Sequence, residues 1–242
     1  VFQAHPMAEA ARRIRQAGFE GVHLGLRFTD RRYDASAPDP DYADRARDTF
    51  GQAGLKIAGL DGYVNLVHPD PAVRRKNVTA LAGMLEDASR FGTNIVATES
   101  GSFHAQDRSN PMPDNLEEGW RMFLGTLKQL VKVAEAAGTV LALEPSFATF
   151  ISTTDMVKRL LGEIESPCFQ ILWDGAHLMH ASDLASTGAA LETMAKTFGS
   201  KVVLAHANDV RLGEAGKTES CRAGTGELDY HAYIDQLRGL KR

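Results

Sequence analysis

Short apolar runs alternate along the chain with longer stretches in which apolar residues recur at helical spacing. The runs are predicted to be β-strands, at residues 21–26, 55–60, 94–98, 140–144, 169–174 and 202–206. The longer stretches are predicted to be helices, most of them ended by a glycine, at residues 9–16, 42–52, 73–91, 116–137, 154–161, 183–198 and 231–237. A new strand begins roughly every 30 to 45 residues, which indicates βαβ units and a parallel sheet.

The predicted strands show little alternation of polar and apolar residues, as expected of strands that are covered on both faces. A doubly wound open sheet would have the same period. Two observations favour a TIM (β/α)8 barrel. No Gly-x-Gly-x-x-Gly motif opens a helix after the first strand, and polar residues that could form a site follow several different strands. Eight strands would require one before Ala4 and one after Arg242, so we expect the first and last strands to be missing or truncated.

Composition narrows the function classes. The chain has 242 residues, of which 43% are hydrophobic, and a formal net charge of −4. This length suits one barrel, and without a linker we expect residues 1–242 to form a single domain. The charge gives no basic surplus, so we expect no nucleic acid partner. Without a signal peptide, a long apolar run or a disulfide framework, we expect a cytoplasmic protein with no membrane partner.

Three of the predicted strands end directly in a residue that can bind a metal ion, namely Glu144, Asp174 and His206. Each has an ordinary alternative explanation. Glu144 could form a salt bridge, Asp174 could cap the next helix, and His206 could be a hydrogen-bonded core residue. The carboxyl ends of barrel strands meet at one rim, so the three together favour a site for one divalent metal ion.

The residue types limit the identity of this ion. One imidazole with carboxylates is a borderline-hard ligand set that suits Mn²⁺, Mg²⁺ or Co²⁺, and Zn²⁺ also remains open. Three protein ligands would leave coordination positions for substrate oxygens.

Further polar residues near the predicted strand ends are candidates for substrate binding. His177 lies one helical turn after Asp174, and Arg211 lies five residues after His206. An arginine there suits a carboxylate, a phosphate or a sugar hydroxyl, although it could instead pair with Asp209. Glu99 follows the strand at 94–98, and His104 lies in the loop beyond it.

Other features have weaker interpretations. His68 is a weaker candidate for the site, and His5 and His23 are assigned no role. The turn at 224–229 could bind an anion through its backbone N–H groups. It could equally be the connection to the last helix, with Asp229 as the cap.

Several short motifs resemble a known family in their order and spacing. They are Ala17-Gly-Phe-Glu-Gly-Val-His23, Ala53-Gly-Leu-Lys-Ile-Ala-Gly59, Leu141-Ala-Leu-Glu-Pro145, Trp173-Asp-Gly-Ala-His177, His206-Ala-Asn-Asp209 and Gly224-Thr-Gly-Glu-Leu-Asp229. Together they resemble the xylose isomerase-like barrel superfamily. That superfamily holds sugar phosphate isomerases and epimerases, inosose dehydratases and metal-dependent apurinic endonucleases.

The resemblance implies roles for individual residues. It implies that Glu144, Asp174 and His206 are metal ligands and that His177 and Arg211 contact substrate. In the resembled epimerases a fourth ligand, a Glu, ends the last strand, and this sequence lacks it. The second Glu of the ketose epimerases is absent here, where the chain reads Ser-Phe-Ala-Thr-Phe at 146–150. The extra His ligands of the endonucleases are also absent, since the chain reads Ser-Cys-Arg at 220–222.

We therefore expect a divalent-metal-dependent sugar isomerase or epimerase that acts on a small keto sugar or polyol. The ion would stabilise an enediolate formed by proton abstraction, with Glu144 or the absent Glu as general base. The alternatives are an inosose-type dehydratase, a non-catalytic sugar-binding protein and, with least support, an apurinic endonuclease. Dimers or tetramers are common in the resembled family, so a homo-oligomer is also considered, although no residue pattern marks an interface.

Overall fold

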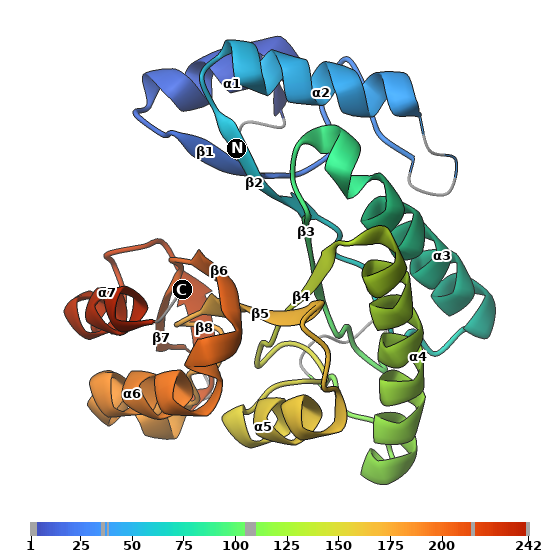
Figure 1. Ribbon diagram of the computed structural model, residues 1–242. Helices are drawn as coiled ribbons and strands as arrows, with labels where there is room; N and C mark the ends of the chain where they lie inside the picture. The colour runs from blue at the N-terminus through green and yellow to red at the C-terminus, as the bar shows by residue number, and fades with distance from the viewer. Residues whose placement is uncertain (1–3, 35–36, 38, 105–109, 214–215, 241–242) are drawn as a thin grey trace.

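A curved sheet of parallel strands organises the molecule, and helices cover its outer face (Figure 1). The computed structural model describes residues 4–34, 37, 39–104, 110–213 and 216–240. Within these residues the sheet has the order β1-β2-β3-β4-β5-β6. The strands are β1 (Gly21–Leu24), β2 (Lys56–Asp61), β3 (Ile95–Glu99), β4 (Val140–Glu144), β5 (Phe169–Asp174) and β6 (Val202–His206). Sheet order therefore follows chain order, as a β/α barrel requires.

The helices follow the strands around the outside of this arc. They are α1 (Met7–Gln16), α2 (Pro40–Gln52), α3 (Pro71–Asp87), α4 (Leu116–Ala137), α5 (Thr154–Glu163), α6 (Thr187–Phe198) and α7 (Tyr230–Gly239). Figure 1 shows α1 and α7 at the two ends of the arc. The sequence-based prediction of a TIM barrel is confirmed. The expected first and eighth strands, before Ala4 and after Arg242, lie outside the described residues.

Local sequence explains where the helices begin and end. Asn115 accepts a hydrogen bond from the N–H of Glu118, and Thr153 accepts one from the N–H of Met156, so both cap free donors of the first helical turn. Asp229 caps α7 in the same way, as the second interpretation of the 224–229 turn expected. The glycines that follow α1, α2, the 73–91 stretch and α4 all adopt the left-handed conformation, which ends a helix at little steric cost.

Two predicted helices are shorter than expected. The 73–91 stretch consists of α3 and a 3₁₀ turn, η2 (Ala88–Phe91). The 183–198 stretch begins with a separate 3₁₀ turn, η3 (Ala181–Ser186), which His180 caps reciprocally with Asp183. Helical periodicity does not distinguish a last or first turn of 3₁₀ type from an α-helix. No described helix is both long and apolar enough to span a membrane.

Each face of the sheet has its own hydrophobic cluster. The larger cluster lies between the strands and the surrounding helices and includes Trp120, Phe150 and Trp173. The smaller one consists of Ala97, Ala142 and Leu172, with Ile95, Val203 and Leu204 packed against them. Its members alternate along the strands with residues of the larger cluster, so the smaller cluster fills the inside of the curved sheet.

A two-stranded antiparallel hairpin projects after β6 and was not predicted. It consists of β7 (Asp209–Leu212) and β8 (Thr218–Cys221), paired so that Arg211 lies opposite Glu219. The segment Thr-Glu-Ser-Cys has no apolar alternation, so the pattern of hydrophobic positions could not reveal a strand there. The base of the hairpin is held by the buried carboxylate of Asp209, which accepts hydrogen bonds from the N–H groups of Val210, Gly226 and Leu228.

Candidate metal and substrate site

The pleat of the strands explains why the candidate ligands point to one place. Glu144 follows Ala142 by two residues, Asp174 follows Leu172, and His206 follows Leu204. Of the three earlier residues, Ala142 and Leu172 belong to the cluster inside the curved sheet and Leu204 packs against it. Side chains two positions apart on a strand share a face, so the three later residues continue the same inner face to its carboxyl edge.

Strand register aligns these residues at one edge. Glu99 pairs with Glu144 between β3 and β4, and Asp174 pairs with His206 between β5 and β6. Tyr233 of α7 strengthens the second pair, because its hydroxyl contacts the carbonyl oxygens of Trp173 at 2.7 Å and His206 at 2.8 Å. The register thus places these strand ends at one edge of the sheet, as the sequence analysis expected.

The carboxylate of Glu144 lies at the centre of the site and is 5% exposed. Its Oε1 atom lies 2.9 Å from Nδ1 of His177 and 3.4 Å from Nδ1 of His206. Its Oε2 atom accepts a hydrogen bond from the hydroxyl of Tyr63. Burial alone would raise the pKa of Glu144, but the hydrogen bonds from His177, His206 and Tyr63 outweigh burial and lower the pKa. Glu144 is therefore ionised at neutral pH.

Asp174 lies beside Glu144 and has two functions within the fold. Its Oδ1 accepts a hydrogen bond of 2.9 Å from the N–H of Ala176, so the residue does cap the turn that follows β5. Its Oδ2 accepts one of 2.7 Å from the side-chain amide of Asn208 and lies 3.9 Å from Nδ1 of His177. The turn places His177 back over the two carboxylates.

The two histidines of the site have different surroundings. Burial lowers the pKa of His177, but the hydrogen bond with Glu144 and the charge of Asp174 outweigh burial and raise it. Nε2 of His206 lies 2.9 Å from Nδ1 of His23, which reaches across the inside of the sheet from β1. Burial lowers the pKa of His23. Its Nε2 atom is buried and has no hydrogen-bond partner within the described residues.

The donor set fits a divalent metal ion. Glu144, Asp174 and His177 each offer one ligand atom, and these atoms lie within 4.8 Å of one another. Two carboxylates and one imidazole suit Mg²⁺, Mn²⁺, Co²⁺ or Zn²⁺. The cluster contains His177 where the sequence analysis placed His206. Nδ1 of His177 lies near both carboxylates, at 2.9 Å from Glu144 Oε1 and 3.9 Å from Asp174 Oδ2.

A cavity of about 530 Å³ opens over this cluster. Six of its lining residues bear on the chemistry: Tyr63, Glu99, Glu144, His177, His206 and Asn208. Four of these, Glu99, Glu144, His177 and His206, are candidates from the sequence. The structure thus brings them together around one space large enough for a small carbohydrate.

Two other candidates lie elsewhere. Arg211 lies on β7, where its side chain is 56% exposed and its guanidinium pairs with Glu219 at 2.7 Å. Its alternative partner from the sequence, Asp209, is buried and bonded to backbone N–H groups instead. His104 lines a different cavity, together with Phe103 and Met122. The described structure does not bring Arg211 or His104 to the Glu144 cluster.

Three residues of the site were missed. Tyr63 follows the end of β2 by two residues, so the reasoning that found the metal candidates could have found it if phenols had been considered. Asn208 follows His206 by two residues. His23 lies within β1 rather than at its end, and only the curvature of the sheet brings it to His206.

Tyr63 gives a prediction for metal affinity. Replacing Tyr63 by Phe should weaken Mn²⁺ binding by about 10-fold, because the carboxylate of Glu144 loses the donor that orients it. Isothermal titration of Mn²⁺ into the metal-free protein would measure this. The matched control is Tyr33→Phe, since Tyr33 donates a similar hydrogen bond to Asp87 far from the site. Equal Mn²⁺ affinities of Tyr63→Phe and wild type would contradict the prediction.

Comparisons with known proteins identify the family and the fold. A family model described as the xylose isomerase-like TIM barrel matches residues 11–241. None of the curated proteins compared with the chain matches it. The fold is similar to that of a 3-keto-D-glucoside 4-epimerase from E. coli, with a TM-score of 0.71 and 20% identity over 99% of this chain and 84% of the epimerase.

Two further solved structures have the same fold. A xylose isomerase-like TIM barrel protein from Mycobacterium smegmatis in complex with magnesium has a TM-score of 0.71 and 17% identity over 99% of this chain and 80% of that one. A mannonate dehydratase from Streptococcus suis has a TM-score of 0.70 and 17% identity over 94% of this chain and 76% of that one. On the match of the family model, which spans most of its length, the chain belongs to the xylose isomerase-like TIM barrel family.

Proposed function

We propose that the protein is a divalent-metal-dependent sugar isomerase or epimerase that acts on a small keto sugar or polyol. The observation that carries this proposal is the cluster of Glu144, Asp174 and His177, with His206 beside it, at the base of a cavity of about 530 Å³. The fold similarity to an epimerase and to a magnesium-bound protein supports it. A cytoplasmic location and a homo-oligomeric state remain part of the proposal.

Glu144 and Asp174 would hold the ion, with an imidazole from His177 or His206. When bound, the ion would act as a Lewis acid that stabilises negative charge developing on substrate oxygens. In our proposal Glu144 also accepts the proton from the carbon beside the carbonyl group, at one of its carboxylate oxygens. Tyr63 and Asn208 position Glu144 and Asp174 through their hydrogen bonds, and Glu99 and the second imidazole orient substrate hydroxyls.

Dehydration is the second candidate reaction, because the same proton abstraction leads to loss of water when a hydroxyl group lies on the next carbon. The fold similarity to a mannonate dehydratase supports this alternative. Return of the proton to the neighbouring carbon gives isomerisation, and its return to the opposite face of the same carbon gives epimerisation. Departure of a hydroxyl group gives dehydration.

Proton exchange in heavy water tests the proposal directly. The Mn²⁺-loaded protein would be incubated in D₂O with a panel of ketoses and inososes and followed by ¹H NMR. We expect loss of the proton signal beside the carbonyl group of one substrate, together with the signals of an isomer or epimer. An unsaturated product would establish the dehydratase instead. Sugar binding without any exchange would overturn the enzymatic proposal in favour of a binding protein.

A further inference from the structure

A second cavity, of about 440 Å³, lies beside the candidate site. Phe147 and Ala148, in the loop between β4 and α5, line both cavities. The backbone of this loop is held in place, because the N–H of Phe147 donates a hydrogen bond of 2.7 Å to the carbonyl oxygen of His177. The two cavities are therefore adjacent along one fixed loop.

The β7–β8 hairpin forms another wall common to both cavities. Ser220 lines the first cavity and Thr218 lines the second. These residues are two positions apart on β8, so their side chains share one face of the hairpin. Arg211 and Glu219, which lie opposite each other in the register, share the other face and pair there at 2.7 Å. One face of the hairpin thus presents hydroxyl groups to both cavities.

The two cavities differ in charge. Carboxylates of Glu99 and Glu144 line the first. Lys217 lines the second, and it is the one Lys or Arg among the described residues that line either cavity. Its ammonium group has no ion-pair partner within the described part of the chain. A positive charge thus lines the second cavity, whereas carboxylates line the first.

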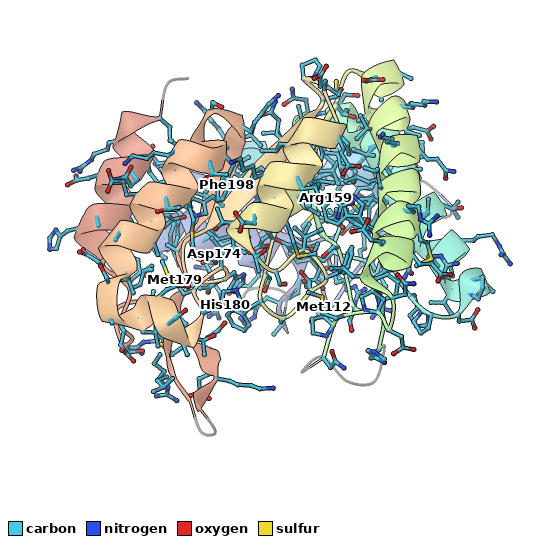
Figure 2. The ribbon with its side chains drawn as sticks, turned by 90° about the horizontal axis from the view of Figure 1, so that it is seen from below. Met112, Arg159, Asp174, Met179, His180 and Phe198 are labelled. Atoms are coloured by element: carbon cyan, nitrogen blue, oxygen red, sulfur yellow. The ribbon has the colours of Figure 1, made fainter. Side chains whose placement is uncertain are left out.

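His180 completes the second cavity as a fixed wall. Its Nε2–H donates a hydrogen bond of 3.0 Å to the carbonyl oxygen of Ser152, so the imidazole is held between the β5–α6 and β4–α5 connections. Figure 2 shows His180 on the side of the molecule from which the hairpin projects. The imidazole and the backbone N–H of His180 are already bonded within the protein. Lys217 and the hydroxyl group of Thr218 therefore remain as the groups of this cavity that can bind an anion.

We propose that the second cavity is a subsite for an anionic group, a phosphate or a carboxylate, at the end of the substrate remote from its reacting carbon. The substrate class would then be an acidic carbohydrate rather than a neutral one. This inference rests on the proposed function for the location of the reacting carbon. The recognition itself depends on Lys217 and the hydroxyl face of β8.

Binding measurements test the subsite without requiring turnover. The Mn²⁺-loaded protein would be titrated calorimetrically with D-fructose, D-fructose 6-phosphate and D-glucuronate, which separates phosphate from carboxylate. We expect at least one acidic sugar to bind about fivefold more tightly than fructose, the size expected of one partly exposed charge contact. Lys217→Ala should remove this preference and leave fructose binding unchanged. Lys128→Ala, an exposed lysine in the middle of α4, should retain it.

Four other outcomes would overturn the proposal of an anion subsite. These are equal affinity for acidic and neutral sugars, no binding of any of the three, an unchanged preference in Lys217→Ala, or an equal loss in Lys128→Ala. Failure of the proposed function looks different. A preference that depends on Lys217, in a protein that exchanges no substrate proton in D₂O, would leave the subsite intact and remove the isomerase or epimerase activity.

Discussion

Replacing Glu144 by Gln should weaken Mn²⁺ binding by more than about 100-fold and reduce turnover to below about 1% of wild type. The reason is the central position of this carboxylate. One oxygen faces both imidazoles and the other accepts the hydrogen bond from Tyr63. A glutamine of the same shape removes the charge that attracts the ion, and it places an amide group where an acceptor is required.

Metal content of the purified variant would be measured together with its turnover of the sugar that exchanges its proton in D₂O. The matched control is Glu192→Gln, which changes an exposed carboxylate of α6 that pairs with Lys196 on the surface. A thermal unfolding curve close to that of wild type would show that Glu144→Gln is folded. Full metal content with full activity would remove Glu144 from both of its proposed roles.

Asp209→Asn should lower the free energy of unfolding by about 2 to 3 kcal/mol, because buried N–H groups lose a charged acceptor. In the wild type Oδ1 accepts from Val210 at 2.8 Å and Leu228 at 3.1 Å, and Oδ2 accepts from Gly226 at 2.8 Å. An asparagine keeps one acceptor atom, and its NH₂ group then meets an N–H donor. Urea unfolding of the two proteins would measure the difference.

A matched control is available in the same segment. Asp229 is exposed and caps α7 through a single N–H, that of Ala232. Asparagine is as good a helix cap as aspartate, so Asp229→Asn should change stability by less than about 0.5 kcal/mol. Equal losses of unfolding free energy from the two substitutions would show that the buried hydrogen bonds of Asp209 stabilise the fold no more than the exposed cap of Asp229 does.

The contribution of Asp209 to the free energy of unfolding should depend on pH. Burial would raise the pKa of Asp209, but the backbone hydrogen bonds from Gly226, Leu228 and Val210 outweigh burial and lower the pKa below its ordinary value of 3.8. The unfolded state therefore binds a proton first as the pH falls. The stability from Asp209 is complete above about pH 5 and is lost as the pH falls through the lower folded pKa. The difference between wild type and Asp209→Asn should shrink correspondingly below about pH 4, as urea unfolding in acid would show.

Regular local patterns explain why much of the fold was predictable. The strands that end in Glu144, Asp174 and His206 were predicted with the bounds that the structure shows. In each case an apolar run ends abruptly at a polar residue. This local pattern can be seen in the sequence without any knowledge of distant contacts. Because the carboxyl ends of parallel strands share one edge, the meeting of these side chains followed from the fold class alone.

The contacts that were missed depend on residues far apart in the chain. Tyr63 and Glu144 are separated by 81 positions, and His23 and His206 by 183. No periodicity encodes such pairs. The orientation of Arg211 required the register of a hairpin whose second strand is polar, and the choice between His177 and His206 required the geometry of the turn after Asp174. These features arise from tertiary packing, so the pattern of hydrophobic and polar positions could not predict them.

The hydroxyl of Tyr233 gives α7 an unexpected importance. It contacts two carbonyl oxygens at the ends of β5 and β6, those of Trp173, the residue before Asp174, and of His206. The spacing of those two strand ends therefore depends on a helix that lies on the outside of the sheet. A shift of α7 along its axis would therefore move the ends of β5 and β6 relative to each other, and with them the side chains of Asp174 and His206.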